Sequence, residues 1–133
     1  MGSASLGPPE TRSLVAGYLR VSWTLSGLDP AEIHLQGVLD FVGCEALDRV
    51  VAGVLLKQYR RILIDLSQLD RMTAAGADGL LKAATAIRQR SGRVALVGPT
   101  QNVRTLIESV GLDRQIDVYD TEEVAVRGIE SER

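Results

Sequence analysis

Hydrophobic and polar residues follow two different periods along this chain, and each change of period marks a predicted element. The apolar run Ile62–Leu66 has the length and β-branched content of a buried strand. A polar turn follows it, and then comes Thr73, a residue type suited to capping a helix. Apolar residues then recur at helical spacing, so the pattern predicts a strand, a tight loop and a helix start. The apolar positions of that helix are Ala77, Leu80, Leu81, Ala84 and Ile87.

The segment before this strand alternates with a period of two, which is typical of half-buried strands. In Tyr18–Leu25 every second residue is apolar, and Ile33 and Leu35 resume the pattern after the turn Gly27–Pro30. Two adjacent strands with a short polar link favour an antiparallel hairpin. One face of that hairpin is expected to be core and the other to be open and polar.

The remaining patterns extend this alternation of strands and helices to the end of the chain. They predict a helix from about Cys44, a strand at Val94–Val97, a helix capped by Thr100, a short strand at Ile116–Tyr119 and a weak helix from Thr121. The order is β-β-α-β-α-β-α-β-α. This order predicts an α/β fold with a mixed β-sheet of four to five strands and about four helices, mainly on one face.

The expected domain boundaries come from composition. Residues 1–17 are rich in Gly, Ser and Pro and show no periodicity, so we expect a flexible N-terminal tail there. Residues 18–127 form a single predicted domain, and residues 128–133 are expected to be a C-terminal tail. A chain of 133 residues is long enough for one core of ordinary size.

Composition and charge exclude several classes of function. The net charge of −2 gives no reason to expect binding to nucleic acid or anionic lipid, and aromatic residues make up only 4% of the chain, which argues against a base-stacking surface. No apolar run is long enough to span a bilayer and no signal peptide is visible. We therefore expect a cytoplasmic protein that does not insert into a membrane.

The single cysteine and the single histidine limit the chemistry that is available. One Cys excludes an internal disulfide and a thiolate metal cluster, and one His excludes a two-histidine relay. We interpret His34 as an exposed hairpin histidine rather than a general base, because no Ser or Cys is recognisably placed to partner it. We interpret Cys44 as a small, partly buried hydrophobe rather than a redox-active thiol.

No catalytic or metal-binding motif is present. The phosphate-binding loop, the nucleophile elbow and the zinc-protease helix are all missing from the sequence. Asp65, Asp70 and Asp78 could be imagined as a Mg²⁺ site, but such acids more often cap turns or stay solvated. We expect no enzymatic activity, no metal and no cofactor.

Four short motifs in this order resemble a known family. They are Gly37–Asp40 at the end of the second strand, Ile64–Ser67 on the central strand, Thr73–Gly76 at the loop, and Val110–Asp113 at the end of the third helix. With the elements between them, they make residues 18 to about 127 similar to a STAS domain. This is the fold of bacterial anti-sigma factor antagonists and of the cytoplasmic tails of sulfate transporters.

The resemblance implies regulation by partner switching. In the family, a serine-kinase anti-sigma factor phosphorylates the Ser or Thr directly before the loop glycine, and the antagonist is then released. That position is Ala75 here, with Ala74 beside it and Thr73 in place of the family's Asp. A methyl group cannot accept a phosphoryl group, so this switch is not expected at Ala75. Thr73 is interpreted as a helix N-cap worth about 1 kcal/mol, with a displaced phosphosite as the alternative.

Two functional hypotheses follow from the resemblance. The first is a non-catalytic regulator that binds a serine-kinase anti-sigma factor without phosphorylation switching at the usual position. The second is a structural STAS subunit of a stress-signalling scaffold or a transporter ATPase complex; a small-ligand or nucleotide sensor is a weaker third idea, and a homodimer is left open. The expected contact residues are Asp70, Arg71, Met72, Thr73, Ala74, Ala75, Gly76, Asp78 and Gly79.

Overall fold

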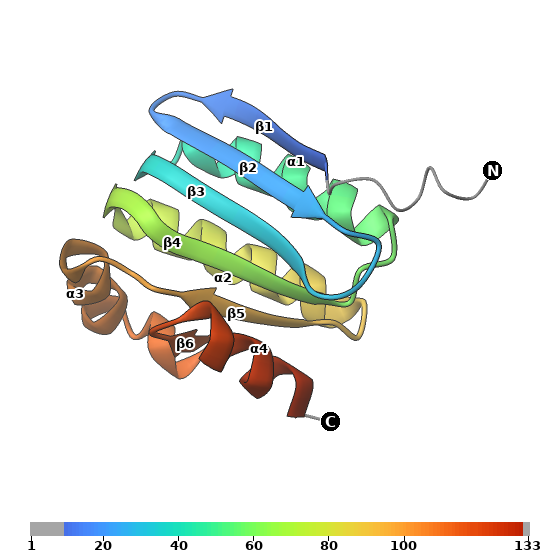
Figure 1. The fold of residues 1–133 in the computed structure, drawn as a ribbon. Coiled ribbons are helices and arrows are strands. Elements are labelled where there is room, and N and C mark those ends of the chain that lie inside the picture. Colours follow the sequence, from blue (N-terminus) through green and yellow to red (C-terminus); the bar gives the residue numbers. More distant parts are fainter. Residues whose placement is uncertain (1–9, 132–133) are drawn as a thin grey trace.

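A computed structural model describes residues 10–131 of the chain (Figure 1). The first half consists of β1 (Glu10–Ala16), β2 (Leu19–Leu25), β3 (Ala31–Leu39), α1 (Gly43–Leu56) and β4 (Arg61–Met72). The second half consists of α2 (Ala74–Gln89), β5 (Arg93–Val97), α3 (Gln101–Val110), the single-turn helix η2 (Leu112–Arg114), β6 (Asp117–Tyr119) and α4 (Glu122–Ser131).

The strands form one mixed sheet in the order β1-β2-β3-β4-β5-β6, which is also their order along the chain (Figure 1). The first three strands pair antiparallel, and β3 to β6 pair parallel. The predicted hairpin of β2 and β3 is confirmed, with Trp23 opposite Ile33. Because the last four strands are parallel, their carboxyl ends meet at one edge of the sheet, where β3 leads to α1 and β4 leads to α2.

The two faces of the sheet are covered unequally. Helices α1, α2 and α3 pack against one face of the sheet and bury the main aliphatic core there. Ile62 and Ile64 of β4 point to this face and belong to this core. Leu63, between them, points to the opposite face and packs with Ala125 and Ile129 of α4. On that face, helix α4 contacts mainly β4, β5 and β6. In residues 10–131, three of the four α-helices therefore lie on one side, as the polar face of the hairpin predicts.

The predicted caps at Thr73 and Thr100 are confirmed. Thr73 Oγ1 accepts a hydrogen bond from the Gly76 N–H, and Thr100 Oγ1 accepts one from the Val103 N–H. Gly111 follows α3 with a left-handed φ of 74°, which glycine adopts without a steric cost. In residues 10–131, no helix combines the length and apolarity that crossing a bilayer would require.

The prediction of four to five strands is wrong, because the sheet has six. The additional strand is β1, which lies inside the segment expected to be a flexible tail. It pairs with β2 along its whole length, from Glu10 opposite Leu25 to Ala16 opposite Leu19, and Leu14 packs against the core. Hydrogen bonding to β2 holds β1 in place. The sequence of β1 is short and has no period of its own, so it does not predict a strand.

The prediction of a C-terminal tail at residues 128–133 is also wrong for most of that segment. Helix α4 continues through Ser131, and Ile129 is only 3% exposed. The domain therefore extends beyond residue 127 because the last turn of α4 supplies part of the smaller apolar cluster. Residues 1–9 and 132–133, the remainder of the two predicted tails, lie outside the described residues.

Candidate functional site

The candidate site is the junction between β4 and α2, where Thr73 is the only residue between strand and helix. Its backbone is extended, with φ −93° and ψ 169°. Its N–H donates to the Leu39 carbonyl at 3.0 Å, and its hydroxyl oxygen lies 3.0 Å from the Gly76 nitrogen, whose N–H it accepts. The hydroxyl also reaches the Leu39 carbonyl at 3.5 Å. Thr73 therefore acts as the N-cap that the sequence predicts, and it ties the start of α2 to the end of β3.

Gly76 brings the first turn of α2 very close to strand β3. A Cβ at this position would lie 2.1 Å from the Leu39 carbonyl oxygen, a backbone atom that cannot move aside freely. Only glycine therefore fits between the helix and the strand end. The close approach fixes the position of the two residues before it, Ala74 and Ala75.

The predicted contact residues divide into an exposed set and a buried set. Asp70, Arg71, Ala74, Ala75 and Asp78 are exposed, and Thr73 is half-buried. Met72, Gly76 and Gly79 are buried. The buried residues shape this surface from beneath, and direct contact between them and a partner stays a prediction. What the helix start presents to solvent is two methyl groups, with charged side chains on either side.

Helix α1 packs against the start of α2 through Cys44. A Cβ at Gly79 would lie 2.2 Å from Cys44 Sγ, so the two helices touch at this pair. The Cys44 thiol lies 3.7 Å from the Ala75 carbonyl oxygen and donates to it. Burial raises the pKa of the Cys44 thiol, and the neighbouring carboxylates raise it further. Cys44 is thus partly buried and packs between the two helices, as the sequence interpretation proposed, and its raised pKa favours the thiol over the thiolate.

Exposed apolar side chains that the sequence interpretation missed lie at the same edge of the sheet. Tyr18 and Phe41 are each 80% exposed and Val42 is 54% exposed; we call these three residues the apolar patch. Tyr18 lies in the turn between β1 and β2, and the other two lie between β3 and α1. This edge also holds the end of β4 and the start of α2 (Figure 1). Apolar residues in a predicted loop, such as Phe41–Val42, are the sequence signal that could have found it.

His34 and Asp65 form an ion pair on the more open face of the sheet, opposite the face that α1, α2 and α3 cover. His34 Nδ1 lies 3.1 Å from Asp65 Oδ2, and His34 Nε2 lies 3.4 Å from Glu32 Oε1. The hydrogen bond to Asp65 raises the pKa of His34 above its ordinary value of 6.5, although burial opposes this. The same bond lowers the pKa of Asp65 from 3.8 to about 2. His34 is therefore a half-buried, paired residue, and the expectation of an exposed hairpin histidine is wrong.

The three aspartates considered as a Mg²⁺ site have separate surroundings. Asp65 pairs with His34 and also accepts from the Ser67 N–H at 2.8 Å. Asp78 lies on the exposed side of α2, 3.5 Å from Lys82 Nζ, and Asp70 is exposed. Within the part of the chain that the structure describes, no three His, Cys, Asp or Glu side chains are grouped so that they could hold a metal ion.

Comparison with known proteins gives a consistent result. The STAS domain family model matches residues 25–125. BtrV of Bordetella bronchiseptica, whose assigned role is anti-sigma factor antagonist, is 32% identical over 91 residues, which are 68% of this chain and 78% of that protein.

Solved structures share the fold at lower sequence identity. An anti-sigma factor antagonist from Mycobacterium paratuberculosis is 20% identical with a TM-score of 0.70, over 92% of this chain and 96% of that one. The antagonist SpoIIAA in its unphosphorylated form is 20% identical with a TM-score of 0.69, over 85% and 98% of the two chains. SpoIIAA of Bacillus in the phosphorylated form gives a TM-score of 0.62 at 20% identity, over 82% and 98%.

Proposed function

The chain belongs to the STAS domain family, and we propose that it is a non-catalytic regulator of the anti-sigma factor antagonist type. Its proposed partner is an anti-sigma factor of the serine-kinase type. The relationship to BtrV supports the general regulatory role. The observation that carries the finer proposal is the exposed, uncharged helix start at Ala74 and Ala75, at the same edge of the sheet as the apolar patch.

The chemistry of this edge suits a protein partner. Large exposed apolar side chains gathered at one edge are typical of interaction sites, and Tyr and Phe are enriched in interfaces. Arg71 and Asp78 are exposed charged residues near the helix start, where they would orient the partner rather than supply most of the affinity. The proposed docking surface consists of Asp70, Arg71, Ala74, Ala75, Asp78 and the apolar patch.

We further propose that docking is not switched off by phosphorylation at Ala75. SpoIIAA exists in an unphosphorylated and a phosphorylated form, and the family resemblance places the phosphorylated hydroxyl directly before the loop glycine. A phosphoryl group would add about −1.5 to −2 units of charge to this surface and oppose docking by repulsion and desolvation. Ala75 has no hydroxyl to accept it, and the Thr73 hydroxyl is engaged as the helix cap. The amount of complex between this protein and its partner would then depend on the concentrations of the two proteins and not on phosphorylation at Ala75.

The partner is identified by pull-down from the native cell with the tagged full chain as bait. Recovery of a serine-kinase anti-sigma factor supports the proposal, whereas recovery of transporter or scaffold subunits supports the structural alternative. Ala75→Glu as bait should weaken capture at least about tenfold, because it places a charge in the centre of the surface. Thr85→Glu is the matched control: it adds the same charge on an exposed site of α2, ten residues further along the helix, and should leave capture unchanged.

Intact-mass measurement after incubation with the recovered kinase and ATP tests the absence of switching. The wild-type chain should gain no phosphate, and Ala75→Ser, which restores a hydroxyl, should gain one. A gain in the wild type that disappears in Thr73→Val would instead establish Thr73 as a displaced phosphosite and overturn this part of the proposal.

A further inference from the structure

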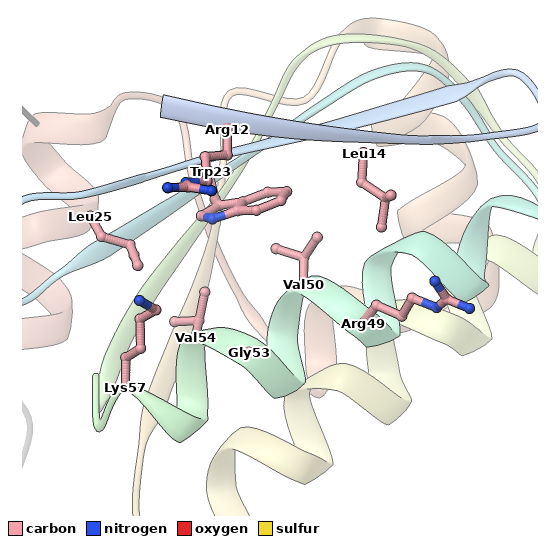
Figure 2. A pocket seen from close by; sticks show the side chains of 9 residues that line it. All are labelled: Arg12, Leu14, Trp23, Leu25, Arg49, Val50, Gly53, Val54 and Lys57. Atoms are coloured by element: carbon pink, nitrogen blue, oxygen red, sulfur yellow. The ribbon is translucent and has the colours of Figure 1, made fainter. Parts of the chain in front are cut away.

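A cavity of about 420 Å³ lies between helix α1 and the strands β1 and β2, away from the proposed docking surface (Figure 2). This volume is in the range of small-molecule sites. Its lining residues come from the edge strand β1, from its neighbour β2, and from one side of α1 and the residue that follows it. They are Arg12, Leu14, Trp23, Leu25, Arg49, Val50, Gly53, Val54 and Lys57.

The wall of this cavity is mainly apolar, and residues 10–131 leave it open. Leu14, Trp23 and Leu25 on the strand side are only partly buried, although all three pack against the main core. Gly53 keeps the space open on the helix side, because a Cβ at this position would meet no atom within 4 Å. An elongated apolar group could therefore lie along α1 without displacing any side chain.

The charged residues that line the cavity are all cationic. In a chain of net charge −2, the lining residues in the described part include three cations and no acid. Figure 2 shows Arg12 and Lys57 toward one end, beside Leu25, and Arg49 toward the other end of α1. Two of the three cations therefore lie at the end beside Leu25, which makes that end the better place for an anionic group.

We propose that this cavity binds a free aliphatic carboxylate, such as a fatty acid in its monomeric form. The carboxylate lies beside Lys57 and Arg12, and the chain runs along Trp23, Val54 and Val50 toward Leu14. A net charge of −2 gives the protein no general attraction to an anionic bilayer, and a cavity between a helix and two strands accommodates a single chain, so the ligand is a dissolved molecule rather than a membrane. Neither Lys57 nor the cavity is part of the proposed docking surface.

The first test is a titration of the full chain with sodium decanoate, kept below the concentration at which it forms micelles. Trp23 is the only tryptophan and lines the cavity, so its fluorescence reports binding directly, and calorimetry gives the stoichiometry. We expect one saturable site whose affinity rises about fourfold for each added methylene until the cavity is full. Decyltrimethylammonium, with the same chain and a cationic head, should bind at least about tenfold more weakly.

Two pairs of variants test the placement of the ligand. Gly53→Leu fills the space and should abolish binding while the thermal unfolding transition is kept, whereas Gly53→Ala adds a single methyl group and should reduce affinity only slightly. Lys57→Glu should weaken decanoate binding at least about tenfold, while Arg49→Glu, the same charge change at the other end, should change it less than about threefold. Equal losses in Lys57→Glu and Arg49→Glu would overturn the proposed position of the carboxylate.

Three other results would overturn the proposal as a whole. They are no saturable binding by the wild type, equal binding of the anionic and cationic amphiphiles, and binding that survives Gly53→Leu. Co-sedimentation with phosphatidylglycerol vesicles without binding of monomeric decanoate would likewise replace the proposed ligand by a membrane surface. None of these results bears on partner capture by the docking surface, so the two proposals fail independently.

Discussion

Gly76 and the Leu39 carbonyl make the tightest backbone approach at the candidate site. The space for a side chain there is filled by a main-chain oxygen, which belongs to a paired strand and is held by the Thr73 N–H. Any Cβ must push the start of α2 away from β3. The position of Ala74 and Ala75 thus depends on a single residue whose own atoms are buried.

Gly76→Ala should lower the free energy of unfolding by about 2–3 kcal/mol, because the added methyl group overpacks against backbone. Urea denaturation measures this directly. Gly53→Ala is the matched control, because it is also a glycine in a helix but has open space around its Cβ position. It should leave stability unchanged or raise it by up to about 1 kcal/mol, as expected from helix propensity. A Gly76→Ala variant as stable as the wild type would contradict the tight approach.

The His34–Asp65 pair is the second feature at this scale. Three carboxylates face His34: Asp65 from β4, Glu32 from β3 and, near the start of α4, Glu122. The imidazolium is thereby favoured in the folded state, so the folded-state pKa of His34 lies above the unfolded one. Its contribution to stability is complete below pH 6.5 and is lost as the pH rises through the raised folded-state pKa.

His34→Gln should therefore be less stable than the wild type at about pH 5.5, by up to about 1 kcal/mol, and equal to it at about pH 9. Urea denaturation at the two pH values measures the difference. Asp65 adds an acid limit: its contribution is present above pH 3.8 and is lost as the pH falls toward about 2. In a background of Asp65→Asn, the effect of His34→Gln at about pH 5.5 should shrink. If the stability difference between the wild type and His34→Gln grew with pH, the raised folded-state pKa of His34 would be contradicted.

At the scale of elements, α4 shows how a terminal helix becomes part of the domain. It is the one helix that the structure places on the open face, and it packs on Leu63, Ala95 and Val97 through Ala125 and Ile129. These two residues lie four positions apart and therefore on one side of the helix. The remaining helix surface is largely exposed and charged.

Ile129→Ala should destabilise the protein by about 2–3 kcal/mol, because it removes a buried side chain and leaves a cavity. Val124→Ala is the matched control on the same helix: Val124 is 41% exposed, against 3% for Ile129, and its truncation should cost less than about 0.5 kcal/mol. Thermal or urea unfolding compares the two variants. If both were neutral, α4 would be a frayed end rather than part of the fold.

At the scale of the whole molecule, the sequence predicts best where a strong period coincides with a complete element. The hairpin of β2 and β3, the apolar start of β4 and the helix that follows Thr73 are examples. The prediction fails where a neighbour supplies the reason for the structure. Strand β4 continues to Met72 through a stretch that reads as a polar turn, because it pairs with Leu39 of β3 after two register shifts. Strand β1 likewise depends on β2.

The candidate site shows the same division. The cap at Thr73 and the exposed pair Ala74–Ala75 follow from local sequence, because a cap and a helix start are local structures. The burial of Met72 and the exposure of Phe41 depend on how two loops and a strand end meet, which periodicity does not report. The pairing of His34 with Asp65 depends on the parallel register of β3 and β4, which places these residues opposite each other.

Because Cys44 contacts Ala75, alkylation of its thiol can report whether a partner occupies the docking surface. The only thiol of the chain lies 3.7 Å from the main chain of the second residue of α2, wedged between two helices that touch there. The thiol is only partly buried, so a maleimide can reach it in the free protein. A protein seated over Ala75 would cover this thiol, and slowed alkylation would then report where the partner sits.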